Sequence, residues 1–417
     1  MRRFKNLKDF YKSTDNLKYF ILNGVFFTLM FNCSKAYTPK FLTRIGGTDS
    51  EIFLYNSFIG LAALIATIPA IILTNRSKNK KITMVKFLIA SRFFLLVLAI
   101  IPFLSNTISP WAFLIVSSVM SIPDTIGGTA FQGFVGDTFK EEDRSSALSL
   151  KSQFSALTQV IILILLSLLL TATNFPNETV VRIYQVLFVV GFIFGFFEVK
   201  ALYDMKELTH TSNDRVKLKD GMRSILKNKR FLIFIPCSLF FHFSMFLEGP
   251  AFSVYQISYL KANELWISIL TIITSIITFL VFSKWSRVIR RKGNYYTLFL
   301  SSFIISFTPF VYLIARNIYT IIVANILQGV GIAGISVCIL NEVLESSDSD
   351  KKIFYVGLHS LLINTMLFVT PIISDIIVIR VGIYTAFIII GCLKFLASFV
   401  FFLKFISLKR AKAKTSI

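Results

Sequence analysis

The sequence has few residues of the types that perform most enzyme and metal chemistry. Its 417 residues include only three histidines and four cysteines, and no two cysteines form a C-x-x-C pair. The cysteines fall in four different apolar stretches and have no histidine partners, so they are expected to act as small apolar side chains. We therefore expect no metal site and no cofactor.

Signatures of nucleotide binding and hydrolysis are also missing. The chain contains no G-x-x-x-x-G-K-[ST] loop, no H-E-x-x-H and no G-x-S-x-G. Energy from ATP would need a separate subunit, and an intramembrane hydrolase is disfavoured. We do not expect an enzyme.

Apolar residues dominate the chain. They make up 55% of it, the mean hydropathy is +0.71, and 45 residues are phenylalanine, which is too apolar for a water-soluble fold. Six apolar stretches precede a polar strap at 204–229 and six follow it; a helix of about 20 residues crosses the hydrocarbon layer of a bilayer. The sequence predicts an all-α membrane protein with twelve transmembrane helices in two pseudo-symmetric six-helix bundles, 1–203 and 230–417, joined by a cytoplasmic linker.

Ten of the predicted spans have well-marked bounds. They are 17–41, 52–74, 82–104, 111–136, 145–172, 181–203, 231–257, 265–283, 354–379 and 383–405, and the ninth and tenth spans meet at Arg316 and Asn317. The first apolar run is too long for a signal-peptide core and has no small-residue cleavage site. It is expected to remain as the first span.

The net charge of +22 raises the question of nucleic-acid binding, and the positions of the 44 basic residues decide it. If the helices alternate in direction, 34 basic residues fall on one side, six on the other and four within spans. This asymmetry follows the positive-inside rule for short loops. It predicts a multi-pass protein of the cell membrane with both termini in the cytoplasm, and it explains the basic charge without nucleic acid.

The two halves repeat one another in their loops. In each half the second and third spans are joined by a basic turn, and the fourth and fifth by an acidic and then basic loop, 137–144 in one and 342–352 in the other. Internal repeats of this kind are typical of secondary transporters, whose substrate site lies between the repeats near the middle of the membrane.

Short motifs add a family resemblance that covers the whole chain in topology. Residues 71–80 are similar to the G-x-x-x-D-R-x-G-R-R loop of the major facilitator superfamily, with Arg76 and Lys80 kept and Asn75 in place of the aspartate. Residues 140–147 look like the family's loop after the fourth helix. Three features depart from the family: the fourth span has no arginine, the tenth has Asn325 at that place, and 147–172 lacks the Gly/Pro motif of many proton-driven exporters.

The resemblance implies transport by alternating access, in which two lobes rock about a central site. It also implies that the cytoplasmic loops latch the lobes together. The latch candidates are Arg76, Lys80, Asp137 and Arg144.

Two charged residues near the middle of the membrane are candidates for coupling to protons. Arg92 and Asp124 lie at similar depth in the third and fourth spans, and an isolated charge at the bilayer centre costs about 2.5 to 3.5 kcal/mol. Two interpretations stay open: the two side chains form a structural ion pair, or protonation of Asp124 is linked to transport. The second follows from the resemblance, because the fourth helix lines the cavity in this family.

A second pair is a candidate for an outer gate. Lys35 and Glu248 lie at near-equivalent positions in the first and seventh spans, which close the outer side of the cavity in the family. We expect them to form a salt bridge in the inward-open state; the alternative is that each pairs elsewhere or reaches water. Pro250 next to Glu248 is expected to break the helix ladder and allow bending.

Polar side chains on the other expected cavity helices suggest a substrate that forms hydrogen bonds. The candidates are Asn23, Asn32, Thr129, Gln132, Gln153, Asn325, Gln328, His359 and Asn364. For each one alone, the alternative is a hydrogen bond between helices. His242 and His359 are expected to pack or to relay protons, and Glu198 and Lys200 are expected at the membrane interface.

The sequence thus predicts a monomeric secondary transporter of a small molecule, driven by an ion gradient, with protons as the expected partner. Two alternatives from other classes stay open. One is a receptor or accessory subunit that kept the fold and lost transport, for which Asn75 is the best argument. The other is a flippase for a lipid or amphiphile, which should have an opening lined by phenylalanine.

Overall fold

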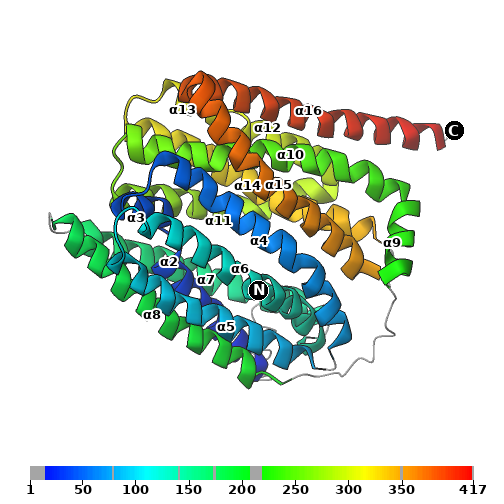
Figure 1. Ribbon diagram of the computed structural model, residues 1–417. Helices are drawn as coiled ribbons and strands as arrows, with labels where there is room; N and C mark the ends of the chain where they lie inside the picture. Colours follow the sequence, from blue (N-terminus) through cyan, green and yellow to red (C-terminus); the bar gives the residue numbers. More distant parts are fainter. Residues whose placement is uncertain are drawn as a thin grey trace, which may run out of the picture. The chain divides into compact units, whose positions relative to one another are not determined.

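A computed structural model describes residues 15–77, 79–139, 141–171, 175–206, 218–347 and 351–415 (Figure 1). Over these residues the protein is helical and has no β-strand. Twelve spans within them are long and apolar enough to cross a membrane. The predicted all-α membrane fold is confirmed.

The first of two compact units comprises residues 1–47 and 65–215. Its core joins helices far apart in sequence, since Phe20, Met84, Phe134 and Leu202 belong to one buried cluster. The described helices are α2 (Asp15–Ser34), α3 (Thr38–Arg44), the second half of α4 (Asp49–Arg76), α5 (Lys80–Ile100), the 3₁₀ turn η1 (Ile101–Phe103), α6 (Ser109–Thr138), α7 (Glu141–Thr171) and α8 (Asn177–Asp204).

The second unit comprises residues 48–64 and 216–417, so the first half of α4 belongs to it. Its core is aromatic: the rings of Phe252 and Tyr312 stack with centroids 3.6 Å apart, and Phe387 packs edge-on against both. Its helices are α9 (Leu218–Lys227), α10 (Lys229–Val254), the π-helix η2 (Tyr255–Tyr259), α11 (Glu264–Lys292), α12 (Asn294–Ile305), α13 (Thr308–Ile314), α14 (Ile318–Glu345), α15 (Lys352–Val381) and α16 (Ile383–Thr415).

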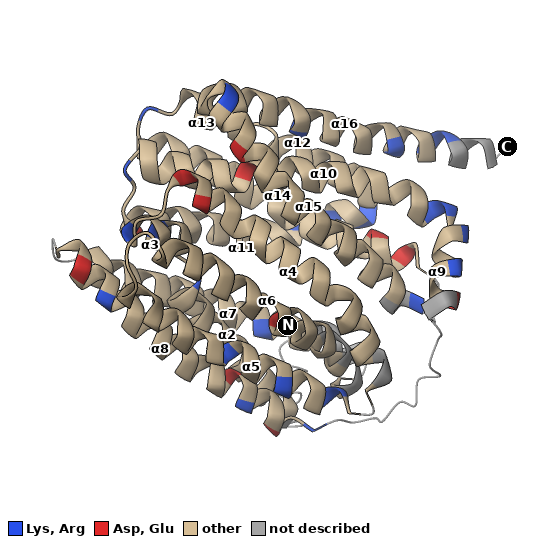
Figure 2. Cartoon of the chain, viewed as in Figure 1, with Lys and Arg blue, Asp and Glu red and all other residues tan. Residues whose placement is uncertain are grey.

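Large apolar side chains are exposed along the spans. Ile65, Leu165 and Ile379 are among those that face outward, and Figure 2 shows that charged residues are sparse along the helices. In water such a surface would drive aggregation, whereas in a bilayer it contacts acyl chains. The helices also satisfy their own backbone hydrogen bonds, which lipid requires.

Two spans are broken where the sequence suggested continuous helices. The first span, expected to be unbroken over 17–41, stops at Ser34 and restarts as α3, and the ninth stops at Ile305 and restarts as α13. Each restart carries a proline in its first turn, where the missing N–H costs nothing because it has no partner within the helix. The break in the first span holds Lys35, whose N–H donates to the carbonyl of Phe31.

Three other sequence expectations need correction. The α10 helix continues through Pro250 to Val254, and its irregular part is the π-helix η2 that follows. The last helix, α16, extends to Thr415 and not to 405. The linker, predicted as a polar strap at 204–229, contains the helix α9, while 207–217 lie outside the described residues.

Direct backbone contact joins α4 and α15 within the second unit. A Cβ atom added at Gly60 would lie 2.5 Å from the amide nitrogen of Phe368 and 2.7 Å from the carbonyl carbon of Leu367. These are backbone atoms, so the clash cannot be relieved by rotating a side chain. The absence of a side chain at Gly60 sets how closely the two helices approach.

We therefore predict that Gly60→Ala destabilises the protein by about 1 to 3 kcal/mol, the usual effect of overpacking. Thermal unfolding of the purified protein in detergent measures this effect. Gly128→Ala is the matched control, because a Cβ there meets nothing within 4 Å. Equal unfolding temperatures for the two variants would contradict the contact.

Candidate functional site

A network of charged side chains crosses the interior of the first unit, and Arg92 is its centre. Only 1% of its side chain is exposed. Its Nη1 lies 2.7 Å from Oδ1 of Asp124, its Nε donates to Oε2 of Glu198 over 2.9 Å, and its Nη2 to Oε1 of Glu198 over 3.3 Å. One guanidinium thus binds two carboxylates, one of them with a forked pair of hydrogen bonds.

Small residues around Arg92 make this arrangement possible. A Cβ at Gly195 of α8 would lie 2.6 Å from Cδ of Arg92, so only glycine lets the arginine stem pass this helix. The hydroxyl of Ser91 donates to Oδ1 of Asp124 over 2.8 Å and satisfies a further lone pair of that carboxylate. Buried ions are tolerated where partners of this kind surround them.

Asp124 links the buried network to a more accessible lysine. The Nζ of Lys35 lies 3.1 Å from Oδ2 of Asp124, and these side chains are 29% and 23% exposed, against 4% for Glu198. Lys35 sits at the break between α2 and α3, which frees it from a regular helical position. The Lys35–Asp124 pair is therefore more exposed than the Arg92–Glu198 pair.

A third cation lies at the other side of Glu198. Lys151 of α7 donates to Oδ1 of Asn23 over 2.7 Å, and its Nζ lies 4.5 Å from the ring centroids of both Phe20 and Phe131. Asn23 in turn donates to the backbone carbonyl of Glu198 over 3.4 Å. The network thus holds three cations and two carboxylates.

The second unit has its own buried ion pair. Glu248 of α10 binds Lys394 of α16, and each side chain is 1% exposed. Thr308 of α13 donates to Oε2 of Glu248 over 2.9 Å, and Gln328 of α14 donates to Oε1 over 3.4 Å. Four helices therefore meet at one carboxylate.

The structure gives the predicted gate residues partners in their own units. Lys35 binds Asp124, and Glu248 binds Lys394. The predicted Lys35–Glu248 salt bridge stays a prediction. Arg92 and Asp124, predicted to lie at one depth, are in direct contact.

Three members of these networks were missed or misplaced by sequence reasoning. Glu198 was expected at the membrane interface, yet it is buried against Arg92, because the end of α8 packs in the core of its unit. Lys394 is one of the four basic residues that the sequence places within spans, and no partner was predicted for it; a search for carboxylates within spans would have suggested Glu248. For Lys151 the only signal was a lysine near Gln153 in an apolar helix.

The remaining cavity candidates have mostly local partners. Asn32 and Thr129 each donate to the carbonyl four residues earlier, Asn325 donates to Ile321 and accepts from Thr274, and Gln153 is exposed. Asn364 lies half-buried in α15, and the side chain of Gln132 lies outside the described part.

The latch candidates are mostly outside the described part of the chain. This applies to the side chains of Arg76, Asp137 and Arg144, whereas Lys80 is half-buried and begins α5.

Two histidines come together in the second unit. The Nε2 of His359 lies 2.9 Å from the hydroxyl of Ser238, and Nδ1 of His242 lies 2.7 Å from the carbonyl of Ser238. The two rings are 6.0 Å apart, and Phe234 stacks on His359. Packing and proton relay both remain compatible with this contact. No group of three metal-ligating side chains occurs among the described residues.

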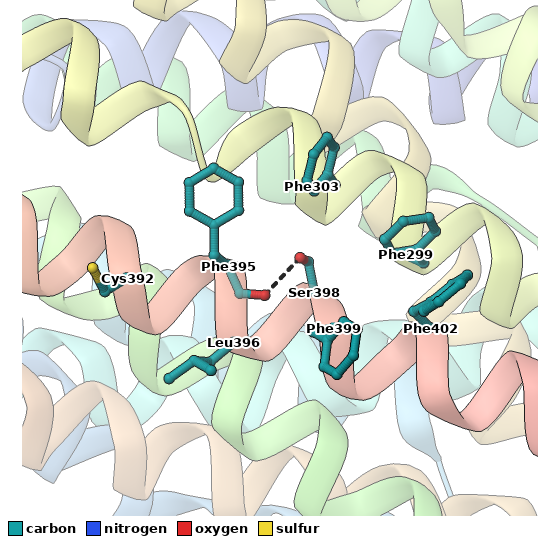
Figure 3. Close-up of a pocket in the computed structure, with 8 residues that line it drawn as sticks. All are labelled: Phe299, Phe303, Cys392, Phe395, Leu396, Ser398, Phe399 and Phe402. Carbon is teal, nitrogen blue, oxygen red and sulfur yellow. Dashed lines mark hydrogen bonds between the residues drawn. The ribbon is translucent and has the colours of Figure 1, made fainter.

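A separate pocket of about 600 Å³ lies between α12 and α16 (Figure 3). Five phenylalanine rings dominate it, with one hydroxyl, that of Ser398, which donates to the carbonyl of Phe395. The lining residues are Phe299, Phe303, Cys392, Phe395, Leu396, Ser398, Phe399 and Phe402. The pocket suits an apolar chain and not a polar solute.

The network predicts a large loss of stability when Arg92 alone is removed. Arg92→Leu should cost about 3 to 5 kcal/mol, because it leaves the buried Glu198 without its hydrogen-bonded cation, whereas Asp124 keeps Lys35. Adding Glu198→Gln should recover part of this loss, since it removes the carboxylate that Arg92 had neutralised. Thermal unfolding measures both, with Arg182→Leu at an exposed position of α8 as the control. A double variant no more stable than Arg92→Leu would contradict the account.

Comparison with known proteins identifies the fold and the family. A family model described as MFS/sugar transport protein matches residues 137–364, more than half of the chain. No curated protein sequence matches the chain. Similar solved structures include the nucleoside transporter NupG, with TM-score 0.68 and 11% identity over 94% of this chain and 99% of that chain, and a D-xylose–proton symporter, with TM-score 0.67 and 13% identity over 92% of this chain and 96% of that chain. The resemblance found from the sequence is confirmed, and the chain belongs to the MFS/sugar transport family of the major facilitator superfamily.

Proposed function

We propose that the protein is a secondary active transporter that carries a small hydroxyl-bearing solute, such as a sugar or nucleoside, by alternating access. The observation that carries the proposal is the partly exposed Lys35–Asp124 pair joined to the buried Arg92. In a protein of this fold, a charged group that is both buried and reachable is the kind of group that links ion movement to conformational change. The moving bodies would be the bundles 1–203 and 230–417.

Two lines of support bear on the substrate class. The matching family model is described as one of sugar transport proteins, and the similar structures are of a nucleoside transporter and a D-xylose–proton symporter. The amide of Gln328 and the imidazole of His359, which contact Glu248 and Ser238 in this structure, are groups that can also donate hydrogen bonds to the hydroxyls of a solute or accept hydrogen bonds from them. A solute with several hydroxyls fits such groups better than an apolar drug does.

The geometry suggests how one proton could be coupled to transport. When Asp124 takes up a proton, Lys35 loses its anionic partner, whereas Arg92 keeps Glu198. The most deeply buried cation is therefore never left unpaired, and the charge that is released is the accessible one. A released ammonium can bind a solute hydroxyl or another carboxylate, which changes the energies of the two conformations.

Orientation and location follow from the charge asymmetry. With 34 basic residues on one side and six on the other, both termini would lie in the cytoplasm of a cell-membrane protein. Arg76, Lys80, Asp137 and Arg144 would close the cytoplasmic side. Lys35 and Glu248 would close the outer side, and the working unit would be a monomer.

The test is Asp124→Asn in proteoliposomes. A thermal-shift screen of the wild type with pentoses, hexoses, disaccharides and nucleosides first supplies a radiolabelled substrate. The variant should lose uptake driven by a pH gradient and keep counterflow exchange, because a neutral amide cannot release a proton while the conformational cycle remains intact.

Glu178→Gln, an exposed carboxylate at the start of α8, is the control and should keep both activities. Gradient-driven uptake by Asp124→Asn at the wild-type rate would remove Asp124 from the mechanism. Binding of a screened solute without any substrate-dependent proton movement or exchange in the wild type would instead favour a receptor that kept the fold.

A specific observation favours a second candidate, an amphiphile flippase. The pocket between α12 and α16 is lined by five phenylalanines, as that function requires. Its volume of about 600 Å³ lies within the usual range of ligand sites.

Under this alternative, the protein should move a fluorescent phosphatidylcholine between leaflets of proteoliposomes. The variant Phe303→Ala with Phe395→Ala should slow this movement at least several-fold, because it removes two facing rings, whose centroids are 5.5 Å apart. Dithionite quenching of the outer leaflet measures the rate. No movement above that in protein-free vesicles would exclude the alternative.

A further inference from the structure

The short helix α9 lies across the ends of two spans of its own unit. Figure 1 shows it running across the ends of α10 and α15 and not alongside them. Its inner face is closely packed: Ile225 is fully buried, and a Cβ at Gly221 would lie 2.6 Å from the ring of Phe354. A helix at the ends of the spans and across their direction lies in the plane of the membrane surface.

Hydrogen bonds fix α9 in this position. The hydroxyl of Ser224 lies 3.0 Å from that of Tyr355 on α15. Asn228, between α9 and α10, accepts from the N–H of Phe231 and caps α10, while its amide donates to Tyr355 and to the carbonyl of Ser346. The direction in which each outer side chain of α9 points is therefore set by the folded unit.

The outer face of α9 has an apolar edge beside a cationic edge. Met222 and Leu226 are 37% and 68% exposed and stand one turn apart. Arg223 and Lys227, also exposed and one turn apart, follow them around the helix by about 100°. An apolar edge beside a basic edge is the pattern of a helix that lies in a membrane interface.

Charge around this face is mainly positive. Lys229, the first residue of α10, is exposed next to α9, and Figure 2 shows basic residues gathered along this segment. The carboxylate on α9 is Asp220, and Glu345 nearby is bound to Arg230. The described cations Arg223, Lys227 and Lys229 therefore exceed the free carboxylates on this face.

We propose that α9 is an interfacial helix that binds anionic phospholipids of the membrane. Arg223 and Lys227 bind the phosphate-bearing headgroups, and Met222 and Leu226 insert among the upper acyl chains. An amphipathic helix with a basic face and an apolar edge, lying at the level where the spans end, matches both layers of the leaflet surface. The inference rests on the membrane fold and is independent of the transported solute.

The test uses the full chain in nanodiscs of phosphatidylcholine with increasing phosphatidylglycerol. The four native cysteines are replaced, a nitroxide is attached to Leu226→Cys, and its collisions with oxygen and with a water-soluble nickel chelate report its depth. We expect the label to lie in the lipid phase and to move deeper as phosphatidylglycerol is added. A label at Asp220→Cys on the same helix should stay in water.

Arg223→Gln and Lys227→Gln should each raise the phosphatidylglycerol content needed for half of the response by about fivefold, the effect expected for one surface cation. Arg223→Lys and Lys227→Arg should keep the response. Soluble glycerol phosphate should not reproduce it, because the site takes headgroups in the leaflet.

Either of two results overturns the proposal. If the Leu226→Cys label is as accessible to the nickel chelate as the Asp220→Cys label in every lipid mixture, α9 does not enter the membrane. If the label lies in lipid but its depth changes neither with the phosphatidylglycerol content nor in the Arg223→Gln and Lys227→Gln variants, α9 does not bind anionic headgroups. Thermal unfolding of each variant shows that the fold is kept.

Discussion

The structure of the first unit depends on one constraint: a guanidinium placed within a membrane span must be neutralised by side chains, because lipid cannot do it. Arg92 meets this constraint with two carboxylates from two other helices. The requirement explains several features together. Gly195 leaves room for the arginine stem, Ser91 supports Asp124, and the end of α8 is buried although it carries a glutamate.

The second unit meets the same constraint differently. Glu248 and Lys394 neutralise one another, and Thr308 and Gln328 complete the hydrogen bonds of the carboxylate. Both members of this pair are buried, whereas the network of the first unit ends at Lys35 and Asp124, which are partly exposed. The buried pair and its hydrogen-bond partners connect four helices.

The sequence alone predicted the membrane spans and the depth of individual charged residues. It did not predict which residues pair with those charges. The apolar runs gave the twelve spans, and the positions of Arg92 and Asp124 within their runs placed them at one level. Glu198 was assigned to the interface because distance from a helix end says nothing about which face packs inward. The breaks near Lys35 and before Pro309 were missed because proline in the first turn of a new helix resembles proline within a continuous one.

The contacts also bear on how an outer gate could work. Lys35 and Glu248, which the sequence repeat predicts at near-equivalent places, have opposite charges, and each is bound within its own unit. Moving Glu248 away from Lys394 would leave a buried ion without its partner, which costs about 3 to 5 kcal/mol. The side chain of Lys35 is 29% exposed, and its separation from Asp124 would cost little once that carboxylate is protonated. A gate of this kind would therefore be controlled from the first unit, by the charge on Asp124, while Glu248 stays where Lys394 holds it.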